Sequence, residues 1–264
     1  MYRVENCQSS LILKENRIYQ GSMVLVNQKC PVRYQLSERE LCPVFPNQPE
    51  IQMEEESAGM LRNLLQKIQG MESITGVSGY RKKEEQIRIF EDSLQENGRD
   101  FTEKYVAFPD CSEHQTGLAV DLAACSPQID FICPEFPYEG ICQTFREKAP
   151  DYGFVERYRE EKQDITGIGG EPWHFRYVGV PHAKLMQREN MALEEYVVWL
   201  KQFDLESHPL EIEEKEWRYQ IGYVRAQGKI TKCSIPEFER IWESGNNEDG
   251  FVITLAVRAQ GNFA

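Results

Sequence analysis

The stretch CSEHQTGLAVDLA, residues 111–123, predicts a strand of a packed sheet. Larger apolar residues alternate with small ones from Gly117 to Ala124, and this two-residue period is typical of a strand. Asp121 lies on the small-residue face, seven positions after His114. Because a buried carboxylate without a partner is costly, Asp121 needs a cation, a donor or a proton. A plainer interpretation is that Asp121 caps a loop and His114 lies at the surface.

Strands and helices are predicted on both sides of this stretch. The helix predicted at residues 82–98 has an apolar stripe of Ile87, Phe90 and Leu94. A connector with four prolines lies within residues 31–49, and a loop rich in proline and acidic residues covers 125–140. Apolar patterns predict further strands at 22–27, 73–80, 152–158 and 171–179, and further helices at 53–70, 141–148, 181–190 and 192–203. We therefore expect an α+β fold, with a mixed or antiparallel sheet flanked by helices.

The character of the chain changes near residue 205. Residues 205–216 are polar and acidic, and three strand-like runs follow at 217–224, 229–235 and 250–257. We expect residues 1–205 to form the main domain and 206–264 a small C-terminal β unit packed on it. A lid, a dimer surface and a stabilising flap all remain open as its role, although the alternating strands favour plain packing.

Composition excludes several classes of protein. The chain has 264 residues, of which 41% are hydrophobic, and a net charge of −13, which argues against a nucleic-acid binder. The first twenty residues lack the pattern of a signal peptide, and no run approaches the length of a membrane-spanning helix. There is no C-x-x-C pair among the eight cysteines, at 7, 30, 42, 111, 125, 133, 142 and 233. We expect a cytoplasmic protein with reduced thiols and no membrane anchor.

A second polar motif is GGEPWHFRYVG, residues 169–179. Glu171 and His174 are three positions apart, but Gly169, Gly170 and Pro172 disfavour a helix. The motif therefore differs from the helical H-E-x-x-H zinc motif. Its plainer interpretation is a glutamate at the start of a strand and a core histidine between aromatic residues.

Together the two motifs supply a ligand set suited to a catalytic zinc ion, which keeps its fourth position for water: His114, Asp121 and His174. Glu171 is then free to act as a base for that water. The other two histidines fit less well. His182 follows a proline at a helix start and His208 lies in the polar linker, so we expect both at the surface.

A third stretch, VSGYRKKEEQ at residues 77–86, places Arg81 where a strand meets a helix. An arginine there can face a pocket and donate hydrogen bonds to a carbonyl oxygen or a carboxylate. Gln86 lies one turn further into the helix. Taken alone, the stretch is also compatible with an ordinary helix start.

SGYR with Gln86, SEHQTGLAVDL and EPWHFRYVG, in this order, resemble the signature of zinc D,D-peptidases of the VanY, VanX and VanXY type. The resemblance covers roughly residues 18–205 and includes KYVAFP before the first metal motif and APDYGF before the second. It is strongest to the bifunctional VanXY type, which joins D,D-dipeptidase and D,D-carboxypeptidase activity in one soluble polypeptide. Residues 1–205 are on this basis expected to be the zinc D,D-peptidase catalytic domain.

The resemblance also implies roles for individual residues. The two motif histidines and Asp121 are expected to hold one zinc ion, with Glu171 as the catalytic base. Arg81 is expected to stabilise the oxyanion that forms at the scissile carbonyl. The expected substrate contacts are Ser112, Gln86, Trp173 and Tyr105.

The implied substrate is a small peptide ending in D-Ala-D-Ala, either the free dipeptide or a pentapeptide precursor of peptidoglycan. Its hydrolysis would support resistance to vancomycin-type glycopeptides. Asp130, Glu135 and Glu139 could meet the ammonium group of a dipeptide, or simply form a solvated loop. Two alternatives remain: a cell-wall recycling L,D- or D,D-carboxypeptidase without a resistance role, and a non-catalytic zinc-binding module.

Overall fold

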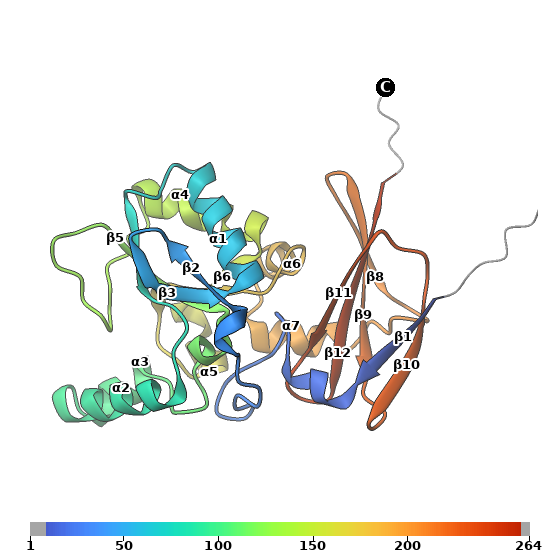
Figure 1. Ribbon diagram of the computed structural model, residues 1–264, viewed down its shortest axis with the longest axis horizontal. Helices are drawn as coiled ribbons and strands as arrows, with labels where there is room; N and C mark the ends of the chain where they lie inside the picture. The colour runs from blue at the N-terminus through green and yellow to red at the C-terminus, as the bar shows by residue number, and fades with distance from the viewer. Residues whose placement is uncertain (1–8, 260–264) are drawn as a thin grey trace, which may run out of the picture. The chain divides into compact units, whose positions relative to one another are not determined.

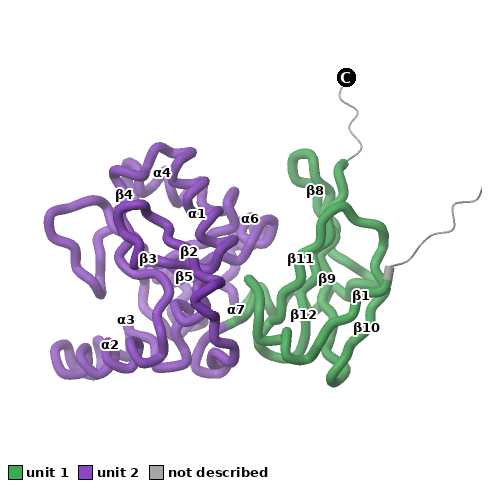
Figure 2. Tube along the Cα trace, viewed as in Figure 1, with its two compact units in different colours: residues 1–25, 195–264 green, residues 26–194 purple. Residues whose placement is uncertain are grey.

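The computed structural model describes residues 9–259 and has the expected α+β architecture (Figure 1). The chain divides into two compact units (Figure 2). Unit 1 takes residues 1–25 and 195–264, and unit 2 takes residues 26–194. Every strand pair in the sheets of residues 9–259 is antiparallel, which agrees with the expected fold class.

The central sheet of unit 2 has four strands in the order β4-β5-β7-β6. All four had been predicted from the sequence, within a few residues at each end. A separate hairpin, β2-β3, lies in the segment that we had expected to be a proline-rich connector. The bounds are β2 (Leu41–Phe45), β3 (Gln48–Glu54), β4 (Ile74–Ser78), β5 (Ala119–Ala124), β6 (Phe154–Tyr158) and β7 (Glu171–Tyr177).

Helix α1 shows how the predicted helices form. Leu61, Leu64 and Leu65 are fully buried, and α1 packs against β2 and β3. The side chain of Glu54 caps the helix by accepting a hydrogen bond from the Ser57 N–H. None of the helices within residues 9–259 is long and apolar enough to cross a membrane. The α-helices are α1 (Glu55–Lys67), α2 (Lys83–Glu96), α3 (Arg99–Tyr105), α4 (Gly140–Lys148), α5 (Gln163–Thr166), α6 (His182–Arg188) and α7 (Leu193–Leu200).

Short 3-10 helices complete the connections. η3 carries the first polar motif, and η4 directly follows α4. Their bounds are η1 (Glu15–Tyr19), η2 (Glu38–Glu40), η3 (Glu113–Thr116), η4 (Ala149–Tyr152) and η5 (Glu160–Lys162).

Aromatic packing fixes β7 in unit 2. The Phe175 ring meets those of Phe136 and Phe145 edge to face, with centroids 5.4 and 4.8 Å away. Phe175 and Phe145 are fully buried. Because side chains alternate along a strand, the neighbouring His174 is directed to the opposite face of the sheet. The packing around Phe175 on one face therefore fixes β7, and the opposite face of β7 carries His174.

Unit 1 is a β unit with two sheets. Four strands lie in the order β11-β12-β9-β8, and β1 pairs with β10. Buried residues from both sheets form one core, which includes Leu13, Val224, Phe251 and Ile253. The bounds are β1 (Ser9–Lys14), β8 (Leu210–Glu214), β9 (Trp217–Arg225), β10 (Ile230–Ile235), β11 (Arg240–Gly245) and β12 (Gly250–Arg258).

The division into units differs from the expected boundary between residues 205 and 206. The N-terminal strand belongs to the β unit, because Leu11 pairs with Cys233 and Leu13 is fully buried in the core of that unit. Leu205, expected at the end of the main domain, lies in the same core. The C-terminal β unit is therefore larger than expected and is completed by the start of the chain.

Two further expectations are wrong. Residues 22–27 form no strand, although Met23 to Val26 are all buried. Their backbone uses irregular partners, such as the Met23 N–H donating to Ser244 Oγ over 2.8 Å. His182, expected at the surface, is buried at the start of α6, because this helix packs against β6 and η4. His208 is exposed as expected.

The described cysteines are free thiols. Cys30, Cys142 and Cys233 are buried, and the remaining four are partly or fully exposed. Cys7, the eighth, lies outside the described residues. No disulfide joins the seven described cysteines, and their reduced state stays a prediction.

Candidate active site

Three neighbouring strands of unit 2 bring polar residues into one row across the sheet. Ser78 on β4 lies opposite Asp121 on β5, and Asp121 lies opposite His174 on β7. Residues that are 43 and 53 positions apart in the chain therefore become direct neighbours. The sheet register, rather than a local motif, assembles this part of the site.

His114 reaches the same row from η3, just before β5. Gly117, at φ +69°, ends this turn and starts the strand, and a side chain there would collide with Leu36. The Nδ1 atom of His114 lies 2.7 Å from the carbonyl oxygen of Gly79, which leaves Nε2 to face Asp121. Gly79 itself passes so close to Gln52 that a Cβ would lie 2.3 Å from its carbonyl oxygen. The histidine is thus oriented by backbone that only glycine allows.

The three predicted metal ligands meet in space. His114 Nε2 lies 3.0 Å from Asp121 Oδ2, and His174 Nδ1 lies 2.9 Å from Asp121 Oδ1. One ligand atom from each residue falls within 4.8 Å of the others, and all three residues are buried. Two imidazoles and one carboxylate at this spacing suit a zinc ion with an open fourth position. The donor set therefore fits the metal that the sequence implies.

The buried ionisable groups of the site have strongly shifted pKa values. Burial disfavours the charged form of Asp121, but the two imidazoles hold the pKa of its carboxyl well below its usual range. Burial also disfavours charge on His174, yet hydrogen bonds to Asp121 and Glu113 raise its pKa to about 9. Burial raises the pKa of Glu171 to about 8, with His174 the largest opposing influence. Carboxylates converging in a buried place favour a cation, whether a proton or a metal.

Arg81 lies next to the ligand cluster and is held from two sides. Its guanidinium donates to Gln86 Oε1 and Ser78 Oγ, each over 2.7 Å, and lies 4.0 Å from Asp121. Its Nε–H is buried without a partner among residues 9–259. Since a buried unpaired donor is costly, this N–H is suited to receive an oxygen atom of a ligand.

All of the predicted site residues line one pocket of unit 2. Glu171 is buried beside the ligands, with Oε2 3.8 Å from His174 Nδ1. The four expected substrate contacts, Ser112, Gln86, Trp173 and Tyr105, also belong to this lining. Gln86 has both amide atoms engaged, because it accepts from Arg81 and donates to the Ala107 carbonyl over 2.6 Å. This arrangement makes Gln86 a support for Arg81.

Eight lining residues had not been singled out as site residues from the sequence, among them Glu113, Phe131, Ile132 and Tyr158. Phe131 and Ile132 come from the proline-rich loop, whose acidic residues Asp130, Glu135 and Glu139 are exposed and outside the lining. Apolar residues such as Phe131 and Ile132, within a loop otherwise rich in proline and acidic residues, were the signal that could have indicated that this loop lines the pocket. Glu113 stands beside His114 in the first motif, but nothing in the residue pattern shows that its side chain is buried.

Comparison with known proteins agrees with this geometry. The family model of VanY, D-alanyl-D-alanine carboxypeptidase, matches residues 50–180. VanXYC of Enterococcus gallinarum, a bifunctional D-Ala-D-Ala dipeptidase and carboxypeptidase, is 38% identical over 183 residues, which cover 69% of this chain and 96% of that protein. The chain belongs to the VanY family. Both histidine motifs and Arg81 fall within the segment that matches the VanY model.

Solved structures extend the comparison. The vancomycin resistance D,D-dipeptidase VanXYg, in complex with a D-Ala-D-Ala phosphinate analogue, matches with a TM-score of 0.92 and 46% identity, over 95% of this chain and 99% of that one. The D,D-pentapeptidase VanY from a VanB-type resistance cassette, in complex with Zn(II), matches with a TM-score of 0.51 and 27% identity, over 67% of this chain and 98% of that one. Similarity to VanXYg thus spans nearly all of this VanY-family chain, including the β unit.

Proposed function

We propose that this protein is a zinc D,D-peptidase that hydrolyses peptides ending in D-Ala-D-Ala. The free dipeptide and the C-terminal bond of a peptidoglycan precursor are the two forms of substrate. One observation carries the proposal: His114, Asp121 and His174 form a buried ligand set, with Glu171 and Arg81 in the same pocket. A non-catalytic zinc module has no use for a buried glutamate and an unpaired arginine N–H at this place.

The metal and the carboxylate of Glu171 divide the chemistry between them. Zinc, when bound by the three ligands, polarises a carbonyl oxygen and makes a water molecule more acidic. Glu171 accepts a proton from the water that attacks the scissile carbonyl and returns it to the leaving amine. Burial raises its pKa, so the carboxyl holds a proton more readily than an exposed glutamate, as it must between taking the proton from water and returning it.

Arg81 supplies a fixed positive charge at the reacting carbonyl. Its Nε–H is free, while Gln86 and Ser78 hold the other nitrogens in place. The group therefore needs no rearrangement when negative charge develops on the substrate oxygen. Ser112, Trp173 and Tyr105 form the nearby walls, where they can contact the substrate and its terminal carboxylate.

The biological role follows from this substrate. Removal of D-Ala-D-Ala ends from the precursor pool takes away the target of vancomycin-type glycopeptides, so we assign the enzyme a part in resistance to them. The precursor pool is made inside the cell, so we also propose a cytoplasmic location and no nucleic-acid or membrane partner. VanXYC, named for both dipeptidase and carboxypeptidase activity, supports this assignment.

Rates on matched substrates test the proposal. The zinc-loaded protein is expected to release D-Ala from free D-Ala-D-Ala, from a pentapeptide ending in D-Ala-D-Ala, or from both. A tetrapeptide with an L,D-linked terminal D-Ala should be a poor substrate. A clear preference for the L,D bond contradicts the proposal and points to a cell-wall recycling L,D-carboxypeptidase. Absence of turnover on every D-Ala-terminated peptide points to a non-catalytic module.

A further inference from the structure

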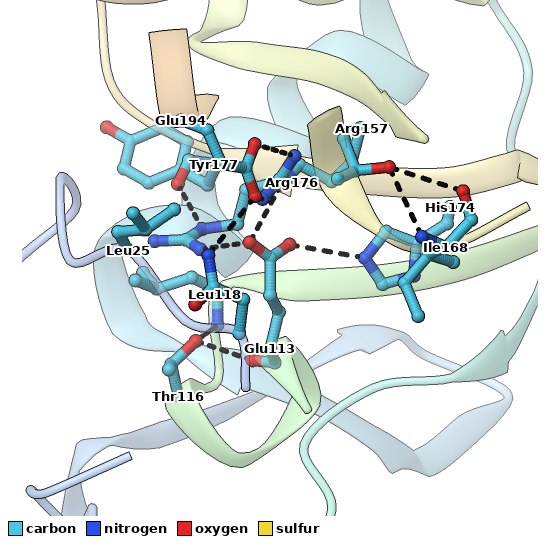
Figure 3. Close-up of polar contacts among 12 residues, drawn as sticks. Leu25, Glu113, Thr116, Leu118, Arg157, Ile168, His174, Arg176, Tyr177 and Glu194 are labelled. Atoms are coloured by element: carbon cyan, nitrogen blue, oxygen red, sulfur yellow. Dashed lines mark hydrogen bonds and ion pairs between the residues drawn. The ribbon is translucent and has the colours of Figure 1, made fainter. Parts of the chain in front are cut away.

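Glu113 lies among buried charged side chains beside His174, one of the candidate zinc ligands (Figure 3). Its Oε1 accepts hydrogen bonds from Arg157 Nε over 2.9 Å and from a terminal nitrogen of Arg176 over 2.8 Å. All three side chains are at most 1% exposed. Arg157 also makes a two-pronged pair with Glu194, over 2.7 and 2.9 Å. We call these four residues the Glu113 cluster.

The Glu113 cluster is electrically balanced. Two guanidinium groups face two carboxylates, so each buried charge has a partner of opposite sign. Arg157 and Arg176 both donate hydrogen bonds to Glu113 Oε1, and an ionised carboxyl is the partner that two guanidinium groups require. Glu113 is therefore a carboxylate, able to accept hydrogen bonds and unable to donate them.

The second carboxylate oxygen of Glu113 is directed at a zinc ligand. Oε2 lies 3.4 Å from Nε2 of His174 (Figure 3). The other ring nitrogen of His174, Nδ1, faces Asp121 at 2.9 Å, within the ligand cluster. Because each carboxylate accepts only, both ring nitrogens carry a proton in these two contacts. A zinc ion bound here would take the place of the proton on Nδ1, while Glu113 keeps the proton on Nε2.

The two carboxylate oxygens of Glu113 have different partners, and this explains why Glu113 is not itself a zinc ligand. It follows Ser112 and precedes His114 in the chain, within a turn that lines the pocket. Both arginines bind Oε1 and fix the carboxylate on the far side of the His174 ring. The side chain can therefore orient the imidazole but cannot swing toward the metal.

The two histidines are oriented by different kinds of partner. His114 contacts a neutral backbone carbonyl through Nδ1, whereas His174 contacts a charged carboxylate through Nε2. A carboxylate behind a zinc-bound histidine orients the ring and strengthens it as a ligand. We propose that Glu113 is a positioning residue that sets the tautomer and orientation of His174 for zinc. The inference rests on His174 being a zinc ligand, as in the proposed function.

A pair of isosteric variants tests this role. Glu113→Gln removes the charge behind His174, whereas Glu194→Gln removes a carboxylate of the same cluster that contacts Arg157 and not the histidine. Zinc affinity is measured by competition with a chromogenic chelator. We expect Glu113→Gln to weaken it by roughly 10- to 100-fold and Glu194→Gln to leave it near that of the unaltered protein. Unchanged affinity in Glu113→Gln, or equal losses in both variants, overturns the proposal.

Two further measurements keep the test decisive. If Glu113→Gln does not fold, the nitrogen-15 shifts of His174 in the unaltered zinc-loaded protein replace it. A protonated Nε2 with the metal on Nδ1 is expected, and coordination through Nε2 overturns the proposal. The variant His174→Ala distinguishes a failure of the proposed zinc ligand set from a failure of the role proposed for Glu113. If it binds zinc as tightly as the unaltered protein, the ligand set of the proposed function fails; if it loses zinc while Glu113→Gln does not, only the role of Glu113 fails.

Discussion

Asp121 and His174 face each other across the paired strands β5 and β7, with carboxylate Oδ1 2.9 Å from imidazole Nδ1. The same carboxylate reaches His114 with its other oxygen, at 3.0 Å. One aspartate on a central strand thus joins two histidines that come from separate parts of the chain. The catalytic predictions below depend on this arrangement.

Glu171→Gln is expected to abolish most of the activity. The amide has nearly the same shape but cannot accept the proton of the attacking water, so kcat should fall by about 10²- to 10⁴-fold. Zinc content, measured by atomic absorption, should be unchanged, because Glu171 is not in the ligand set. Glu161→Gln, which alters an exposed carboxylate, serves as the control. Near-normal kcat in Glu171→Gln rules out its role as the base.

Arg81→Lys keeps the positive charge but loses the planar group that Gln86 and Ser78 hold. A lysine offers no N–H fixed in the direction of Nε. We expect kcat to fall by about 10²- to 10³-fold, as for removal of an oxyanion donor, with zinc content unchanged. A variant in which only KM rises would show that Arg81 binds the ground state of the substrate and does not stabilise the transition state.

His182 should make folding stability depend on pH. Burial lowers its pKa from the ordinary 6.5 to about 4, so the unfolded chain binds more protons than the folded one between these values. Its contribution is fully present above pH 6.5 and is lost as the pH falls toward 4, by up to about 3 kcal/mol. Urea unfolding of the unaltered protein and of His182→Gln across this range measures the effect. Parallel pH profiles of the two proteins would contradict it.

The N-terminal strand offers a test of the division into units. Leu13 is fully buried in the core of unit 1, whereas Ile12, next to it on β1, is 56% exposed. Leu13→Ala should destabilise the β unit by about 2–5 kcal/mol, because it leaves a cavity. Ile12→Ala should change its stability by less than about 0.5 kcal/mol. Similar effects of the two variants in urea unfolding would show that β1 does not belong to this core.

Local sequence patterns predicted the residues of the candidate site better than they predicted the division of the chain into two units. Asp121 and His174 lie in strands whose alternation could be read directly, so their meeting in the sheet was foreseeable once the motifs were taken together. The pairing of β1 with β10 was not, because Leu11 and Cys233 are more than 200 positions apart and no local signal links them. The burial of His182 and of Glu113 likewise depends on tertiary packing, which overrides the preference of polar residues for the surface.

Zinc dependence of D-Ala-D-Ala hydrolysis is the property that distinguishes a zinc D,D-peptidase from the alternatives. The chelator-treated protein is titrated with zinc while release of D-Ala is measured, with His114→Ala titrated in parallel. We expect no turnover without metal, a linear rise to a plateau at one zinc ion per chain, and little recovery in the His114→Ala variant. Turnover that persists in the metal-free protein, or a zinc-loaded protein that hydrolyses neither the dipeptide nor a pentapeptide ending in D-Ala-D-Ala, would contradict the proposed function.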